Sequence, residues 1–274
     1  MSSFFQELFQ SDFLRNALIA GFLTSIACGI VGALTVVNRL AYAAGGIAHS
    51  SLGGIGVALL LGLSPIWGAL FASLLAALIV SWITLKYQEK SDTAISAVWS
   101  LGMAIGILCI YQVDGYTVDP MTYLFGNILL VPHRDLILVA LLDLLVVATV
   151  VILYRPLLII SFDRELAKIR GLPVEVLHIV MMLLLALTIT ALIQVVGLLM
   201  MIALLTLPAA IASRVTKSLS TMMIAGALIG IFSTFFGLLL SWWIDLPSGA
   251  IIIIFITLLY FASLLIPQRI SSGG

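Results

Sequence analysis

Long apolar stretches follow one another along almost the whole chain, with short polar breaks between them. Each stretch is about twenty residues long, the length that a helix needs to cross the hydrocarbon core of a bilayer. The pattern predicts nine crossings, at residues 15–37, 43–63, 65–85, 94–112, 136–154, 178–196, 198–213, 221–243 and 248–266. The seventh crossing contains Pro208, so we expect this helix to be broken or tilted there.

Residues 116–131 (YTVDPMTYLFGNILLV) are too short and too polar for another crossing. This segment predicts a re-entrant or interfacial helix. The fold class is therefore all-α: a single transmembrane domain over residues 1–274, with eight or nine spans.

The longest mainly polar stretch, about residues 161–175, predicts a short amphipathic helix over 162–171. Ser161 or Asp163 can cap its first turn, and Gly171 followed by Pro173 ends it. Such a charged helix is suited either to the membrane interface or to contact with a soluble partner.

Composition agrees with a membrane protein. Hydrophobic residues make up 63% of the chain and charged residues 9%, whereas soluble domains carry roughly 25% charged residues. A net charge of zero gives no support to a nucleic-acid partner. Cys28 and Cys109 lie in apolar runs without CxxC spacing, which favours packing over a disulfide or a metal site.

The distribution of basic residues predicts the orientation, because Lys and Arg are enriched on the cytoplasmic side. With the N-terminus outside and the C-terminus inside, only Arg15 and Arg134 lie outside. The ten basic residues then placed inside are Arg39, Lys86, Lys90, Arg155, Arg164, Lys168, Arg170, Arg214, Lys217 and Arg269.

His49 is an ionisable residue within an apolar span, where such groups usually face the bundle interior. Neutral imidazole is a common ligand of transition metals, but a histidine without a second ligand also fits a structural hydrogen bond between helices. The surrounding glycines provide either close helix packing or room for a narrow path. Asp143, deep in another span, fits a path ligand, a hydrogen-bond partner between helices or a carboxyl kept neutral by burial.

Motifs of enzymatic chemistry are missing. The sequence contains no GxxxxGK[ST], no HExxH and no GxSxG, so it predicts neither an ATP site nor these types of hydrolase. We do not expect an enzyme, and any hydrolysis of ATP belongs to a separate subunit.

Five segments in order resemble the membrane permease subunit of bacterial ATP-binding-cassette importers for zinc, manganese or iron. They are NRLAYAAGGIAHSSLGGIGVALLLG, VDPMTYLFGNILLV, FDRELAKIRGL, TALIQVVGLLMMIALLTLPAAIASR and IDLPSGAIIII. The resemblance implies a homodimer in the bacterial inner membrane, a cytoplasmic ATP-binding subunit and an extracytoplasmic solute-binding protein that delivers the metal. It implies no covalently bound cofactor.

The resemblance also implies site residues. His49 matches the histidine of the metal path and Asp119 matches an outer aspartate, whereas Gly45 and Asn127 stand where the family has aspartates. With a carboxylate missing, imidazole nitrogen favours zinc over manganese, which prefers oxygen ligands.

FDRELAKIRGL matches the segment that couples the permease to its ATP-binding subunit. The residues expected to contact that subunit are Phe162, Asp163, Glu165, Leu166, Ala167 and Gly171. The alternative is a secondary transporter or channel that acts alone, which the missing nucleotide site fits equally well.

Overall fold

The computed structural model describes residues 11–87, 91–113, 128 and 131–265, and within these ranges the chain forms helices and no strands. The principal helices are α2 (Asp12–Val37), α3 (Ala41–Leu60), α4 (Pro65–Lys86), α5 (Ser91–Tyr111), α7 (His133–Ile152), α8 (Tyr154–Phe162), α9 (Arg164–Ile169), α10 (Val174–Val215), α11 (Leu219–Ile244) and α12 (Ser248–Leu264). The predicted helix over 116–131 falls almost entirely outside the described residues.

Eight helical segments in the described part of the chain are long and apolar enough to cross a membrane. Two of them, Val174–Ile193 and Val195–Val215, follow each other within α10, and the apolar helix α12 is shorter than the rest. The prediction of an all-α bundle with eight or nine spans is confirmed.

The break between the sixth and seventh crossings lies at Gly197. Its backbone angles, φ 77° and ψ 173°, belong to a region that essentially only glycine adopts, and they turn α10 sharply. This position agrees with the boundary predicted between the crossings 178–196 and 198–213. The separate expectation of a break at Pro208, within the seventh crossing, was wrong, because Pro208 lies inside the second half of α10 and the helix continues through it.

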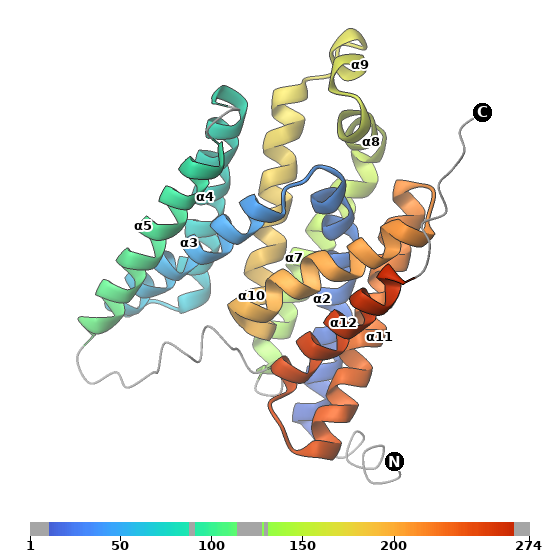
Figure 1. Cartoon of the computed structure of the whole chain (residues 1–274). Coiled ribbons are helices and arrows are strands. Elements are labelled where there is room, and N and C mark those ends of the chain that lie inside the picture. Colours follow the sequence, from blue (N-terminus) through green and yellow to red (C-terminus); the bar gives the residue numbers. More distant parts are fainter. Residues whose placement is uncertain (1–10, 88–90, 114–127, 129–130, 266–274) are drawn as a thin grey trace.

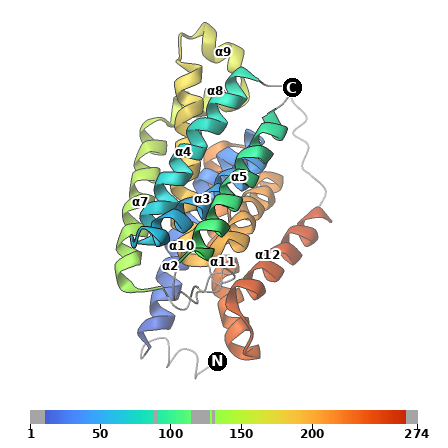
Figure 2. The same cartoon turned by 90° about the vertical axis from the view of Figure 1, so that its left-hand side faces the viewer.

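Helices α3, α4 and α5 form one unit, with α3 between the other two (Figures 1 and 2). A Cβ added to Gly54 of α3 would lie 2.0 Å from the carbonyl oxygen of Gly68 in α4. On the other side of α3, a Cβ on Gly53 would lie 2.7 Å from the carbonyl oxygen of Gly102 in α5. The backbones therefore touch, as in membrane bundles that pack through small residues, and the three helices form a stiff body.

The remaining spans surround α2 and α10. A Cβ on Gly29 of α2 would lie 2.2 Å from the backbone nitrogen of Ala227 in α11, and one on Gly32 would lie 2.1 Å from the carbonyl oxygen of Leu205 in α10. Helix α7 packs on α2 and α10, and α12 packs on α10 and α11.

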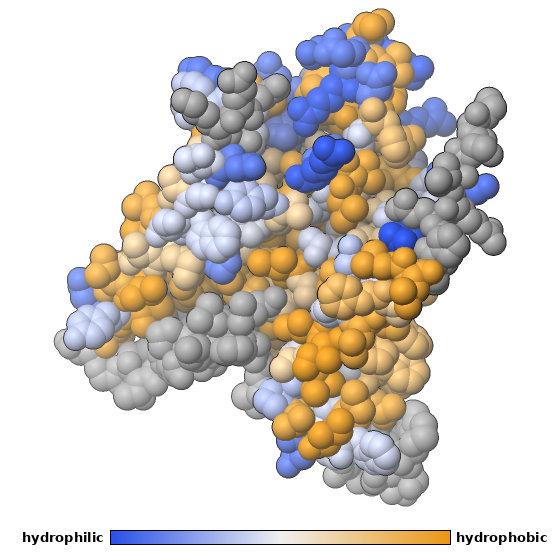
Figure 3. Space-filling model, viewed as in Figure 1, coloured by the Kyte–Doolittle hydropathy of each residue, from blue (hydrophilic) through white to orange (hydrophobic). Residues whose placement is uncertain are grey.

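The short helices α8 and α9 project at one end of the bundle (Figure 1). Hydrophilic residues gather over this end, whereas hydrophobic residues cover most of α11 and α12 in the same view (Figure 3). The surface thus separates a polar end from an apolar belt, the arrangement expected of helices in lipid.

Candidate transport path and coupling helix

His49 lies in the middle of α3 and is 9% exposed. Its imidazole stacks on the indole ring of Trp99 in α5, with centroids 4.2 Å apart and planes 4° apart. Close contact between α3 and α5 is what brings the two rings together, because Gly46, Gly53 and Gly102 have no side chains to separate the helices.

Other polar groups of α5 lie along the same contact. Trp99 Nε1 donates a hydrogen bond to Met103 Sδ at 3.0 Å, and the hydroxyls of Ser96 and Tyr42 are hydrogen-bonded. Tyr42 also lies beside Trp99, at 6.4 Å between ring centroids. Sequence reasoning singled out His49 but not Trp99, since a single tryptophan in a span carries no motif.

The Nδ1 atom of His49 is buried and has no hydrogen-bond partner among the described residues. Within the described part of the chain, this nitrogen therefore does not make the hydrogen bond expected of a structural histidine. In the described part of the chain no three His, Cys, Asp or Glu side chains come together as a metal site. One described copy thus offers a single imidazole rather than a complete coordination shell.

Gly45 lies one helical turn before His49. A Cβ built on it would meet only Ile202 Cδ1, at an ordinary contact distance of 4.0 Å. Unlike the glycines packed against α4 and α5, this buried glycine leaves room for a Cβ. The position where the resembling family carries a carboxylate is therefore not closed by a neighbouring backbone.

Asp119 and Asn127 lie outside the described residues, so their distance from His49 is not described. Asp143 is buried in α7, and neither carboxyl oxygen has a hydrogen-bond partner among the described residues. A hydrogen bond between helices, one of our three interpretations of Asp143, is therefore not made to any residue that the structure describes. Cys28 is buried and free, as its apolar surroundings predicted, and Cys109 is free and half-buried.

The predicted amphipathic helix is α9, but it is shorter than residues 162–171. Asp163 is its N-cap, and Asp163 Oδ1 accepts a hydrogen bond from the backbone N–H of Leu166 at 2.9 Å. Phe162 is therefore the last residue of α8 and not the first of α9, because a capping residue adopts an extended backbone.

Gly171 ends α9 with φ 70°, in the left-handed region. The N–H of Leu172 donates to the carbonyl of Ala167 at 3.0 Å, and that of Gly171 to the carbonyl of Lys168 at 2.9 Å. This pair of bonds is a Schellman motif, which fixes the direction in which the chain leaves a helix.

The side chains of α9 divide between the bundle and the outside. Ala167 is fully buried, whereas Asp163, Glu165, Leu166 and Ile169 are exposed, as is Phe162 at the end of α8. Lys168 and Glu165 form an exposed ion pair at 3.2 Å. An exposed apolar and charged surface on a helix capped at both ends is suited to a protein partner.

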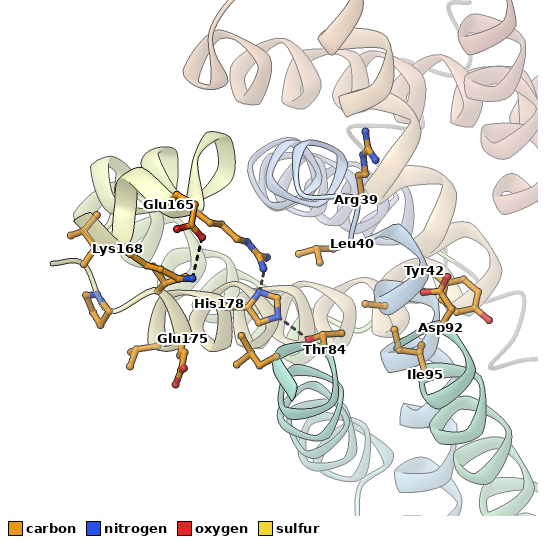
Figure 4. A pocket seen from close by; sticks show the side chains of 17 residues that line it. Arg39, Leu40, Tyr42, Thr84, Asp92, Ile95, Glu165, Lys168, Glu175 and His178 are labelled. Carbon is orange, nitrogen blue, oxygen red and sulfur yellow. Dashed lines mark hydrogen bonds and ion pairs between the residues drawn. The ribbon is translucent and has the colours of Figure 1, made fainter. Parts of the chain in front are cut away.

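A cavity of about 840 Å³ opens beside α9, toward the adjacent ends of α3, α4, α5 and α10 (Figure 4). His178, in the second turn of α10, lines it and is only 2% exposed. Its ring nitrogens contact Arg164 of α9 and Thr84 of α4. No periodicity in the sequence indicates these partners, because they lie on other helices.

Comparison with known proteins agrees with this geometry. The family model of the ABC 3 transport family matches residues 10–267. A membrane protein of Synechocystis is 43% identical over 255 residues, which cover 93% of this chain and 91% of the relative. The manganese transport system membrane protein MntC of Halalkalibacterium halodurans is 33% identical over 260 residues, covering 95% and 89% of the two chains.

Among solved structures, PsaBC from Streptococcus pneumoniae in complex with Fab superposes with a TM-score of 0.88. The aligned part is 32% identical and covers 98% of each chain. The chain therefore belongs to the ABC 3 transport family, and its resemblance to the membrane permeases of ATP-binding-cassette importers is confirmed.

Proposed function

We propose that this chain is the permease of an importer that carries a divalent transition-metal ion, with zinc as the favoured cargo. The observation that carries this proposal is His49, a buried histidine within a membrane span whose Nδ1 atom has no hydrogen-bond partner among the described residues. An ionisable residue at such a depth marks a transport path more often than a packing position. Neutral imidazole suits zinc, whereas manganese is better served by oxygen ligands.

Two copies of the chain form the path in this proposal. A single copy brings one imidazole to the site in its described part, and zinc usually takes four ligands. A homodimer supplies a second His49, and Asp119 is a candidate for the outer part of the path.

The names of relatives make manganese the competing cargo. MntC proteins of Halalkalibacterium halodurans and Listeria monocytogenes are named for manganese transport. Gly45, which stands where the resembling family carries a carboxylate, is the reason that we favour zinc here.

Transport is driven by a separate ATP-binding subunit that docks on α9. The exposed side chains of Leu166 and Ile169 and the ion pair of Glu165 with Lys168 form the docking surface. With the N-terminus outside the cell, α9 lies in the cytoplasm, where ATP is available. A solute-binding protein delivers the ion on the opposite side.

Metal uptake in cells tests the path. Uptake of zinc, manganese and iron is compared between the wild type and His49→Ala at equal protein levels, with His133→Ala as the control because His133 is exposed at the start of α7. We expect His49→Ala to abolish zinc uptake and His133→Ala to preserve it. Zinc uptake that survives His49→Ala contradicts the proposed path.

Co-purification tests the docking helix. The permease is expressed with the ATP-binding subunit encoded beside it, as wild type, Leu166→Asp or Leu166→Met. A buried charge at a protein interface is costly, so Leu166→Asp is expected to release the subunit while Leu166→Met retains it. Retention of the subunit by Leu166→Asp places the docking surface elsewhere.

A further inference from the structure

His178 connects α9 to α4 through two hydrogen bonds. Arg164 Nη2 lies 3.4 Å from His178 Nδ1, and His178 Nε2 lies 3.0 Å from Thr84 Oγ1. In Figure 4 the imidazole lies between Thr84 and the helix that carries Glu165 and Lys168. Helix α4, which is distant in sequence, thus meets α9 and α10 at one buried side chain.

The direction of each hydrogen bond follows from the chemistry of the groups. A guanidinium group can only donate, so His178 Nδ1 accepts from Arg164. In the neutral ring the hydrogen is then on Nε2, which donates to Thr84 Oγ1. The hydroxyl hydrogen of Thr84 goes to the carbonyl of Ser81, at 3.0 Å. The chain of donors and acceptors is complete, as a buried polar network requires.

Helix α4 carries this connection to the histidine of the path. The backbones of Gly68 in α4 and Gly54 in α3 are in contact. A Cβ added to Gly54 would lie 2.0 Å from the carbonyl oxygen of Gly68, and one added to Gly68 would lie 2.1 Å from that of Gly54. A displacement of α4 therefore moves α3 as well, and with it His49 and the stacked ring of Trp99.

A second hydrogen bond joins α4 to α10, the two helices that Thr84 and His178 also connect. Ser73 of α4 and Thr190 of α10 are hydrogen-bonded at 2.7 Å, and both side chains are fully buried. The Thr84–His178 contact lies about three helical turns farther along α4, beside the 840 Å³ cavity. The Ser73–Thr190 hydrogen bond holds α4 and α10 together. The cavity leaves room for the ends of α4 and α10 near α9 to approach or separate.

We propose that Arg164, His178 and Thr84 form a relay that transmits movement of α9 to the unit of α3, α4 and α5. His178 is then a positioning residue for transport, which links the docking helix to the helix bearing His49. The inference rests on the proposed function, because α9 moves only if an ATP-binding subunit acts on it.

The test measures metal transported per ATP hydrolysed in proteoliposomes that contain the permease, its ATP-binding subunit and the solute-binding protein. Thr84→Val removes the hydroxyl that accepts from His178, and Thr84→Ser keeps it. We expect Thr84→Val to lower the ratio of zinc transported to ATP hydrolysed by roughly 3- to 10-fold, the effect of one buried hydrogen bond. Thr84→Ser is expected to keep the wild-type ratio.

Arg164→Met provides a second, exposed variant that leaves the core intact, and Arg170→Met is its matched control. Each removes one exposed positive charge at α9, but of the two only Arg164 contacts His178. We expect Arg164→Met to lower the transport ratio and Arg170→Met to preserve it. Combining Arg164→Met with Thr84→Val is expected to add little to either single loss, because both break the same chain.

The outcome separates the relay from the proposed function. An unchanged ratio in both Thr84→Val and Arg164→Met, with the ATP-binding subunit still bound, overturns the relay alone. Release of the subunit by Thr84→Val also overturns it, since the relay acts after docking. Failure of Leu166→Asp to release the subunit refutes docking on α9 instead, whatever the transport ratio.

Discussion

The indole of Trp99 covers one face of the His49 imidazole, in parallel planes 4.2 Å apart at their centroids. Trp99 is itself held by its hydrogen bond to Met103, one turn farther along α5. The stack fixes the plane of the imidazole and leaves its Nδ1 atom without a hydrogen-bond partner among the described residues. Trp99 is thus a support for the candidate ligand.

Replacing Trp99 with leucine is expected to weaken zinc uptake, because the imidazole loses the ring that orients it. Aromatic pairs contribute about 0.5–1.5 kcal/mol, which corresponds to a rise of roughly 2- to 10-fold in the KM for zinc. The dependence of zinc uptake on concentration measures this effect. Trp99→Phe, which retains an aromatic face, should stay close to the wild type, and an unchanged KM in Trp99→Leu would deny the support role.

Most of the fold could be predicted from the sequence because membrane spans are specified by length and hydrophobicity. The boundaries of the second and third crossings, for example, were expected at 43–63 and 65–85, and the helices run over Ala41–Leu60 and Pro65–Lys86. Asp163, the observed cap of α9, was one of the two predicted caps, since capping depends on local residue types.

The parts that could not be predicted depend on contacts between distant residues. The stack of His49 on Trp99 and the two partners of His178 join residues 50, 14 and 94 positions apart. Nothing in the local sequence encodes which face of α5 meets α3. The boundary at Gly197 agrees with the predicted crossings, whereas the break expected at Pro208 is not seen, because neighbouring helices can accommodate a proline inside a membrane span.

Gly45→Asp is expected to shift the preference of the importer from zinc toward manganese. The new carboxylate lies one helical turn from His49, at a position where an added Cβ meets only an ordinary contact, and supplies the oxygen ligand that manganese prefers. We expect the ratio of zinc to manganese uptake to fall by roughly tenfold, a difference of about 1.4 kcal/mol. Gly45→Leu is the control, because it fills the same space with a side chain that carries no ligand. An equal shift in both variants would mean that filled space, and not the carboxylate, sets the preference.

Gly54→Ala is expected to destabilise the protein. The added Cβ would lie 2.0 Å from the carbonyl oxygen of Gly68, so α3 and α4 must separate, at a cost of about 1–3 kcal/mol. Thermal unfolding in detergent should show a lower midpoint for Gly54→Ala. Gly45→Ala, whose Cβ would meet only an ordinary contact, should keep the wild-type midpoint. Equal midpoints for the two variants would argue against a stiff unit of α3 and α4.

Asp163→Ala is expected to weaken binding of the ATP-binding subunit without removing any exposed apolar contact. Loss of an N-cap costs about 1 kcal/mol, and a helix as short as α9 has little other stabilisation within itself. The affinity of the purified permease for the subunit should fall by roughly fivefold. Asp163→Ser retains a capping oxygen and should bind normally. Equal affinities for alanine and serine at this position would show that the order of α9 does not limit docking.

Reconstitution tests whether this permease moves metal only when a separate ATP-binding subunit drives it. Zinc accumulation is measured in proteoliposomes that contain the solute-binding protein and the permease, with and without the ATP-binding subunit and ATP. We expect accumulation against a gradient only when subunit and ATP are both present, and none for His49→Ala. Accumulation at the same rate by the permease without the ATP-binding subunit would contradict it.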